Sequence, residues 1–529
     1  MNAEPARQSN DLITGLTAIL GGDGVITDLT EREFYSADVY SAGVTCAAVI
    51  RPSDTESLAR AAALITQHGH ALVPRGGGMS YTGGYIPVRE ETVTVDFSAM
   101  NKIIEINEQN MYVTAQAGVT WAQLYPALRE KGLRIPFFGT FSGLHATVGG
   151  GLSNGALFMG TARYGTGADN TLGLEVVLSD GTVVNTGQAG FTNGKPFYRS
   201  YGPDLTGLFL HDAGALGLKT QATFRLMEWP QHYGFLSFVF PGIGAAAGAL
   251  SAISRSGVAE DAYVFDPEST AKNLASVDIT DGIKTLAGVV KSQGNLLQGL
   301  KAGAKIIAAG RDFVGEGMFS VHVVCAGRSE AAVEADMAHC RQIIAARNGE
   351  EIPNSIPIAA RANLYQQPLN SILGPKGDRW AALNAKVAHE DGPKIIAAFD
   401  ALLAPHREAM AAHGVTLTRL LIGIDTHAFS FEPVFHWFDS WLPVHQRIAE
   451  PTHLAKLKNP EANPQAAALV EQLRAEGAKL FAERGAASNQ IGKTYRYLES
   501  MKPSTARILK TLKAEVDPSG LMNPGTLGF

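Results

Sequence analysis

The chain has 529 residues, of which 45% are hydrophobic and 18% are charged, and its formal net charge is −6 at pH 7. This length predicts two or three domains, and the composition is that of an ordinary globular enzyme. The acidic balance excludes the basic footprint of a nucleic-acid-binding protein, and three scattered cysteines, Cys46, Cys325 and Cys340, exclude a disulfide framework or a cysteine-based zinc site.

The first part of the chain alternates short strands with helices. Hydrophobic runs predict strands at 46–52, 71–76, 92–97 and 111–119, and the stretch 174–184 predicts a hairpin with Asp-Gly at its turn. Helices are predicted at 54–69, opened by an aspartate cap, and at 120–132, closed by a glycine. The glycine-rich stretch PRGGGMSYTGG, at 74–84, therefore follows a strand, where a sheet commonly presents its backbone to a ligand.

From about residue 231 the pattern changes to pairs of a strand and a helix. Strands are predicted at 234–240, 318–327 and 418–431, and the helices that follow them at 242–257, 329–349 and 464–485. This pattern predicts an α+β fold with a first domain over 1–230, a second domain over 231–485 and a C-terminal return to the first domain over 486–529.

The segment 284–313 is helical in period and carries five basic residues. A helix with a solvated basic face is the favoured interpretation of this segment. Docking of the basic face to a membrane or to a partner is the alternative.

A second glycine cluster, GLHATVGGGLSNGALFMGTARYG, occupies 143–165. Its glycines approach a dinucleotide fingerprint, but Glu175 lies inside a predicted strand and no clean strand precedes the cluster, so a nicotinamide nucleotide is disfavoured. Two separated glycine-rich loops on one sheet domain instead indicate a long ligand that is held at several points by backbone N–H groups. Such groups suit a pyrophosphate.

Four motifs resemble the FAD-binding domain of the vanillyl-alcohol oxidase and p-cresol methylhydroxylase (PCMH) superfamily. They are, in chain order, PRGGGMSYTGG, VTAQAGVTWAQL, TVGGGLSNGALFMGTARYGTGADNTLGLEVVLSDGTVV and GALGLKTQATFRL. The ending EVDPSGLMNPGTLGF resembles the closing turn of that family. The resemblance, over roughly residues 40–230 and 486–529, implies a two-domain PCMH-type FAD-binding fold with an α+β substrate-capping domain.

The resemblance also implies where FAD binds. The first glycine loop would cradle the pyrophosphate, the second would run toward the isoalloxazine, and the segment at 217–218 would approach the adenine half. The cofactor-binding residues expected from the resemblance are Arg75, Gly76, Gly77, Gly78, Met79, Ser80, Gly83, Thr147, Gly149, Gly150, Gly151, Ser153, Gly217, Leu218 and Asn523. Relatives that bind FAD covalently through this loop have a histidine at the position of Met79, so non-covalent FAD is expected, with His389 as an alternative attachment point.

The resemblance implies that the substrate loses a hydride to flavin N5 and that oxygen or another acceptor then takes the electrons. YGPDLTGLF resembles the phenol-oxidising branch, whereas the first glycine loop and GALGLKT resemble the glycolate oxidase and D-lactate dehydrogenase branch. The Tyr-Arg pair of the phenol branch falls at Ala487 and Ser488, so Tyr495 and Arg496 are the available substitutes.

The metal-dependent members of the 2-hydroxy-acid branch imply a set of ligands that this chain lacks. His427 fits the first ligand, but Val434 stands where the second histidine would be, and Ser488 and Asn489 replace a Glu-His pair. A divalent cation needs several converging donors, so no metal is expected.

The stretch from His427 to Trp441 is rich in aromatic and histidine residues. On a strand, His427, Phe429 and Phe431 would share one face, and histidine is well suited to take a proton near neutral pH. We therefore expect an FAD-dependent oxidase or dehydrogenase that oxidises a small aryl or apolar alcohol, with His427 or His436 as the base. A strand that belongs only to the core is the competing interpretation.

Three other functions stay open. One is oxidation of a D-2-hydroxy acid whose carboxylate is anchored by Arg361 or Arg496, one is oxidation of a para-substituted phenol, and one is a flavoprotein without catalysis or a peripheral membrane electron carrier. We expect a small-molecule substrate, oxygen or an unknown electron acceptor and no nucleic acid, with a homodimer left open and membrane contact disfavoured. The polar start of the chain predicts a cytoplasmic protein.

Overall fold

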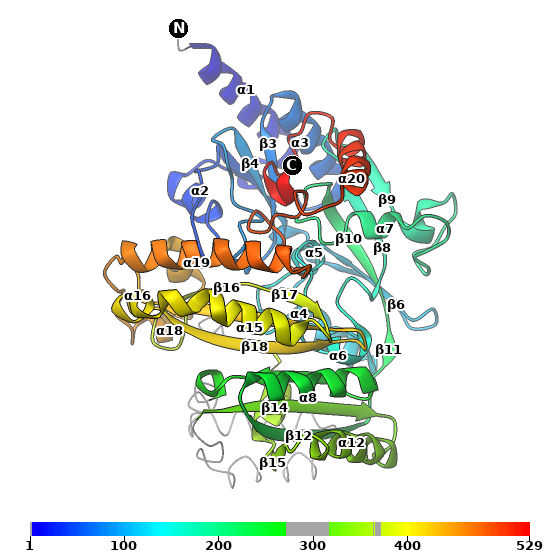
Figure 1. Ribbon diagram of the computed structural model, residues 1–529. Coiled ribbons are helices and arrows are strands. Elements are labelled where there is room, and N and C mark those ends of the chain that lie inside the picture. The colour runs from blue at the N-terminus through cyan, green and yellow to red at the C-terminus, as the bar shows by residue number, and fades with distance from the viewer. Residues whose placement is uncertain (1–2, 271–316, 363, 366–371) are drawn as a thin grey trace.

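The computed structural model describes residues 3–270, 317–362, 364–365 and 372–529 (Figure 1). The α+β class predicted from the sequence is confirmed, because both parts of the chain contain helices and sheets. Two of the three larger sheets lie in the N-terminal part and one lies in the second part. The basic segment 284–313 lies outside the described residues. Within the described part of the chain, no helix is long and apolar enough to cross a membrane.

The N-terminal part contains two sheets. The first has the order β1 (Val25–Ile26), β2 (Ala48–Ile50), β4 (Thr92–Asp96) and β3 (Ala71–Arg75), and the last three strands are parallel. The second is antiparallel, in the order β5 (Ile103–Asn107), β6 (Tyr112–Gln116), β10 (Leu218–Arg225), β8 (Thr171–Val177) and β9 (Val183–Asn185). A short ladder joins β7 (Leu133–Arg134) to β11 (Met227–Glu228).

Helices cover these two sheets and provide the connections between strands. They are α1 (Ala3–Leu20), α2 (Leu29–Tyr35), α3 (Thr55–Gln67), α4 (Trp121–Arg129), α5 (Val148–Ser153), α6 (Thr161–Tyr164) and α7 (Leu205–Leu208). The predicted cap of α3 is confirmed, since the Asp54 side chain accepts a hydrogen bond from the N–H of Ser57. Apolar residues of α3, such as Leu58 and Ile65, pack on Leu72 of β3 and Val93 of β4 in one buried core.

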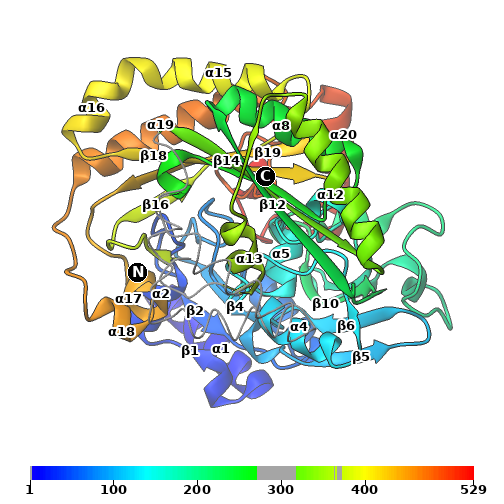
Figure 2. The same ribbon diagram turned by 90° about the horizontal axis from the view of Figure 1, so that it is seen from below.

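The second part is built on an eight-stranded sheet, which we call the cap sheet. Its order is β15 (Glu350–Ile352), β12 (His232–Pro241), β14 (Met318–Gly327), β13 (Asp261–Phe265), β18 (Thr416–Ile424), β19 (Ala428–Trp437) and β16 (Arg379–Ala382), and β17 (Ala385–Ala388) also pairs with β19. Helices α8 (Ile243–Ser256), α12 (Glu330–Ala345), α15 (Gly392–Leu403) and α19 (Pro464–Glu483) bury its outer face. Its inner face is turned toward the N-terminal part (Figure 2).

Five shorter or peripheral helices complete the structure. They are α13 (Ser355–Ala362), α16 (Arg407–Ala412), α17 (Pro443–Ile448), α18 (Pro451–Leu454) and α20 (Pro503–Val516). The last segment of the chain runs from the cap sheet, where Ala487 bridges to Lys386, to the first sheet, where Met522 bridges to Leu72. The C-terminal segment therefore joins the two parts of the molecule.

The strand predicted at 418–431 is wrong. The structure has a hairpin there, in which β18 ends at Ile424, Asp425 adopts a φ of +47°, and β19 begins at Ala428. The hairpin pairs the two strands in full antiparallel register from Ile424 opposite Ala428 to Thr416 opposite His436. His427 consequently lies in the turn rather than on a strand.

A buried cluster of charges also joins the two parts. Glu260, at the start of β13, accepts hydrogen bonds from Arg134 of β7 and from Arg361 of α13, and Arg361 also lies 3.2 Å from the Asp261 carboxylate. The Glu260 side chain is 0% exposed and that of Arg134 1%. Burial alone would raise the pKa of Glu260, but the two guanidinium groups lower this pKa to about 2. Arg361 is therefore already paired within the protein.

Candidate functional site

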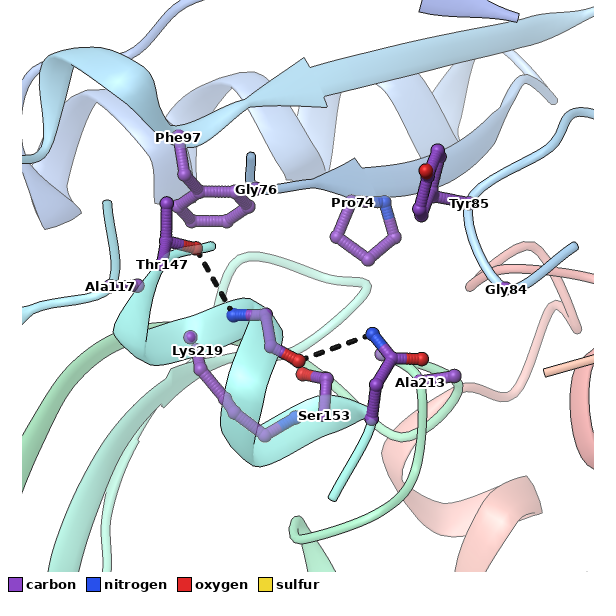
Figure 3. Close-up of a pocket in the computed structure, with 15 residues that line it drawn as sticks. Pro74, Gly76, Gly84, Tyr85, Phe97, Ala117, Thr147, Ser153, Ala213 and Lys219 are labelled. Carbon is purple, nitrogen blue, oxygen red and sulfur yellow. Dashed lines mark hydrogen bonds between the residues drawn. The ribbon is translucent and has the colours of Figure 1, made fainter. Parts of the chain in front are cut away.

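A cleft lies between the two glycine-rich loops (Figure 3). Its walls come from the end of β3 and the loop after it, from Phe97 and Ala117 beside the two N-terminal sheets, from α5, and from the segment that leads into β10. Six glycines belong to this lining, at 76, 84, 149, 150, 214 and 217. Much of the wall is therefore backbone, as expected for a site that binds through amides.

The first loop presents backbone N–H groups that have no acceptor in the described part of the chain. From Gly77 to Thr82, no N–H donates to any residue that the structure describes, whereas the next one, of Gly83, donates to Asp38 Oδ2 at 2.8 Å. The Oδ1 atom of Asn154, which also lines the cleft, is buried and has no partner in the described chain. Both features fit a ligand that combines an anionic pyrophosphate with hydrogen-bond donors, as FAD does.

The adjacent glycines let the two loops approach each other. A Cβ on Gly77 would lie 1.8 Å from the carbonyl oxygen of His145, and one on Gly76 would lie 2.4 Å from Thr147 Oγ1. The sequence predicted that a ligand presses on these glycines. The structure adds a second reason for them, which is close packing between the loops that form the cleft.

Most predicted cofactor residues lie on or beside the cleft. Gly76, Thr147, Gly149, Gly150, Ser153 and Gly217 line it. The loop residues from Gly77 to Ser80 carry the unpaired amides just described. The side chain of Met79, by contrast, packs into an apolar cluster with Trp380 of the cap sheet. Non-covalent attachment of FAD stays a prediction, and the alternative residue His389 contacts the Thr426 carbonyl at 3.1 Å.

Other predicted cofactor residues support the cleft from behind. Arg75 donates to the carbonyls of Phe34 and Ala37 and lies beneath Gly78. Asn523 donates through Nδ2 to the carbonyls of Gly84 at 2.6 Å and Ala213 at 2.7 Å, both of which belong to cleft-lining residues. The side chains of Arg75 and Asn523 therefore hold the walls in place. Two further predicted residues also pack into the structure, since Leu218 is in the core and Gly151 lies against Trp121.

The inner face of the cap sheet carries two deeply placed ionisable groups. These groups are Lys386 of β17 and Glu432 of β19. Together with the neighbouring Asn384 and Ser430 they form a set that we call the capping face. Lys386 is paired with Ser430 in the β17–β19 ladder. Burial lowers the pKa of Lys386 to about 8, with Asp169 opposing the shift, and burial raises the pKa of Glu432 to about 7. Each of these two side chains nevertheless keeps some accessible surface.

The capping face lies against the end of the second glycine loop. Lys386 and Ala487 exchange backbone hydrogen bonds, and two residues later the Asn489 carbonyl lies beside Gly155. The His211 ring lies beside Gly155 as well, and burial, reinforced by Lys386, lowers the pKa of His211 to about 4. The segment 487–489 therefore links the capping face to the second glycine loop, which forms one wall of the cleft.

None of the four predicted catalytic residues lines the cleft, and of the four only Tyr495 contacts the capping face. His427 is exposed in the β18–β19 turn, so the predicted face shared with Phe429 and Phe431 is wrong; those two side chains point into the helix-covered core. His436 is held at both ring nitrogens, by Thr418 at 2.9 Å and by Asp378 at 3.1 Å. Neither histidine lines the cleft.

The C-terminal candidates have structural partners. The hydroxyl of Tyr495 accepts a hydrogen bond from the N–H of Asn384 at 2.6 Å. Arg496 is exposed and lies 3.5 Å from Glu499. Glu175, considered for a nicotinamide nucleotide, accepts hydrogen bonds from Thr55, Thr220 and Gln221 within the sheet.

Several residues of the site escaped the sequence analysis. Asn154 and Lys219 lie inside two of the recognised motifs, although neither was singled out as a cofactor residue. Lys219 pairs with the buried Asp212, so its charge is offset within the cleft wall. Glu432 and Lys386 gave no local signal. In the described part of the chain, no group of three potential metal ligands occurs.

Comparisons with known proteins agree with this geometry. Residues 46–187 match a family model described as an FAD binding domain. The mitochondrial D-lactate dehydrogenase [cytochrome] 1 of Saccharomyces cerevisiae is 25% identical over 491 residues, which cover 90% of this chain and 71% of the yeast protein. Glycolate oxidase subunit GlcD of Bacillus subtilis is 34% identical over 206 residues, which cover 39% of this chain and 42% of GlcD.

A solved structure shares the whole fold. The crystal structure of p-cresol methylhydroxylase with substrate bound superposes with a TM-score of 0.73 at 18% sequence identity, covering 99% of this chain and 97% of that one. At this level of identity the likeness concerns the fold. It includes the cap sheet, which lies outside the residues matched by the family model.

Proposed function

We propose that this chain, an FAD-dependent oxidoreductase with the PCMH-type fold, oxidises a small organic alcohol in the space between the second glycine loop and the capping face. The observation that carries the proposal is that the inner face of the cap sheet contacts both glycine loops: Tyr81 of the first loop donates to Glu432, and Asn489, two residues after the partner of Lys386, adjoins Gly155 of the second. When bound, FAD supplies a two-electron acceptor that takes a hydride as an alcohol becomes a carbonyl compound.

The chain's own residues have separate tasks in this proposal. The amides of Gly77–Thr82 would hold the pyrophosphate, and Thr147–Asn154 would form the opposite wall. The cap sheet would cover the reacting centre and exclude water, which strengthens the electrostatic interactions inside it.

An apolar wall next to the capping face supports an aryl or apolar alcohol. Phe158 of the second glycine loop packs against Phe141 and Tyr263, and Ile422 and Ile424 of β18 belong to the same buried cluster. The aromatic residues predicted for this role from β19 are in the helix-covered core instead. An aromatic environment is therefore present, but it is supplied by other parts of the chain.

The test of the proposal is reduction of the bound flavin under anaerobic conditions. Purified holoprotein is mixed with benzyl alcohols, 4-alkylphenols and both enantiomers of small 2-hydroxy acids, and flavin absorbance is followed with and without EDTA. We expect bleaching by an alcohol, unaffected by EDTA. Failure of all three substrate classes to bleach the flavin would contradict the proposal, and loss of bleaching with EDTA that a divalent metal restores would contradict its metal-free form.

A 2-hydroxy acid is the second candidate substrate, and Lys386 is the observation that favours it. Its Nζ makes no hydrogen bond or ion pair with any residue that the structure describes, although the side chain is deeply placed. Asp169 acts on this ammonium only from beyond ion-pair distance, and a substrate carboxylate would supply a directly bonded counter-charge. Arg361, the anchor considered from the sequence, is already paired with Glu260 and Asp261. Among the relatives above, two are named for D-lactate and glycolate.

Replacing Lys386 with methionine separates the two candidates. If Lys386 binds the substrate carboxylate, K386M should raise KM for a 2-hydroxy acid by about 10- to 100-fold, the equivalent of one hydrogen bond to a charged group. KM for a neutral alcohol should stay unchanged in K386M. The control K394M alters an exposed lysine of α15, and it should leave KM unchanged for both the 2-hydroxy acid and the neutral alcohol. Equal changes for charged and neutral substrates would exclude a carboxylate anchor.

A further inference from the structure

Glu432 is the one carboxylate of the capping face. It lies on β19 between Phe431 and Pro433, opposite Leu420 of β18. Phe431 points into the helix-covered core, and because side chains alternate along a strand, Glu432 points to the inner face. The strand thus directs this carboxylate toward the N-terminal part, where FAD would bind.

Contacts from the first glycine loop confirm this direction. The Tyr81 hydroxyl donates to Glu432 Oε1 at 3.4 Å, and Gln490 Nε2 donates to the Tyr81 hydroxyl at 3.2 Å. Gln490 also accepts a hydrogen bond from Ser80 at 2.9 Å. A hydrogen-bonded chain therefore runs from the loop with the unpaired amides to the Glu432 carboxylate.

The surroundings of Glu432 supply no counter-charge within ion-pair distance. Asn384 Nδ2 approaches Oε2 at 3.3 Å, and no ion pair to Glu432 forms among the described residues. The nearby charged and titratable groups have other partners. Arg474 of α19 donates to the Tyr81 carbonyl, and the Tyr495 hydroxyl accepts a hydrogen bond from the N–H of Asn384. Lys386, on the neighbouring strand, makes no ion pair with it.

This environment sets the proton affinity of the carboxyl group. Burial raises the pKa of Glu432 to about 7, and the hydrogen bonds from Asn384 and Tyr81 oppose the shift. A carboxyl group that ionises near neutral pH is matched to general base catalysis, since it is deprotonated often enough to accept a proton and basic enough to hold it.

We propose that Glu432 is the catalytic base, positioned by Tyr81, that removes the hydroxyl proton of the alcohol. The inference rests on the proposed function. The O–H bond breaks and its proton goes to a Glu432 oxygen, while the C–H bond breaks and its electron pair leaves as hydride to bound FAD, the oxidant, so that the alcohol becomes a carbonyl compound. Protonated Glu432 then releases its proton to solvent before the next turnover.

The first test compares E432Q with the control E408Q, which alters an exposed glutamate of α16. In wild type and E408Q, the rate of flavin reduction should rise with pH through about 7. E432Q should bind FAD normally, reduce it about 100-fold or more slowly, and lose this rise. If wild type is bleached and E432Q keeps both the rate and the pH profile, the inference is wrong and the proposed function stands. If no alcohol bleaches wild type, the proposed function itself fails.

Two further measurements add a readout without turnover and a variant other than E432Q. Infrared titration of the wild-type holoprotein should show a protonated carboxyl band that disappears as pH rises through about 7; it should be present in E408Q and absent in E432Q. Y81F removes a hydrogen bond that favours the carboxylate, so its pH–rate profile should shift to higher pH, which a merely structural role would not cause. An unshifted Y81F profile, or a wild type without the band, would overturn the assignment.

Discussion

Replacing Glu260 with alanine should lower the free energy of unfolding by about 3–5 kcal/mol, because it leaves two buried guanidinium groups without their shared carboxylate. Arg134 and Arg361 are only 1% and 6% exposed, so neither can recover hydration without movement of the structure. Since Arg134 belongs to the N-terminal part and Arg361 to the cap, the loss should be cooperative across both. Denaturant unfolding followed by fluorescence and circular dichroism measures it.

The matched control for this change is E334A, at an exposed position of α12, which should alter stability by no more than about 0.5 kcal/mol. The pH dependence gives a second check. Because the pKa of Glu260 is lowered to about 2, its stabilising contribution is present above the unfolded pKa of about 4.3 and is lost as pH falls from there toward 2. Equal stabilities of E260A and E334A at neutral pH would show that the cluster does not hold the two parts together.

Replacing Gly77 with alanine should weaken FAD binding by about 100-fold. The added methyl group would lie 1.8 Å from the His145 carbonyl oxygen, so one of the two glycine loops must move. Overpacking of this kind costs up to about 3 kcal/mol, which corresponds to about 100-fold in affinity if the cost falls on the bound state. Titration of the apoprotein with FAD, followed by the change in flavin fluorescence, measures the effect.

The control for this experiment is G248A in α8, where an added methyl group meets no atom within 4 Å. This variant should bind FAD as wild type does, because alanine is also favoured over glycine inside a helix. Wild-type affinity in G77A would mean that the first loop can move aside without loss of its contacts to FAD.

The cofactor site was predictable because its signals are local. The spacing of glycines at 76–78 and 149–151 lies within two continuous stretches, and each stretch contributes its own backbone to the cleft. Helix ends were predictable for the same reason, since a cap such as Asp54 contacts an N–H three residues away. Arg75 and Asn523 were found near the site, but their supporting role depends on carbonyls from distant segments.

The hairpin of the cap sheet shows where local signals failed. Two largely apolar stretches, 420–424 and 428–431, are separated only by Asp425, Thr426 and His427. This turn contains neither glycine nor proline, so it went unrecognised. Placing the turn correctly would have separated His427 from the strand face. The alternation along β19 would then have left Glu432 on the inner face together with His436, whose ring nitrogens contact Thr418 and Asp378.

The sequence by itself determined the fold class and the FAD cleft, because glycine spacing, caps and strand periodicity act over a few residues. Only the tertiary structure decided which groups could take part in the chemistry. Tyr81, Asn384 and Glu432 come from three separate parts of the chain and meet at one point. The proton affinity of Glu432 follows from the loss of water around it at that meeting point, and desolvation is a property of the assembled structure that no single segment carries.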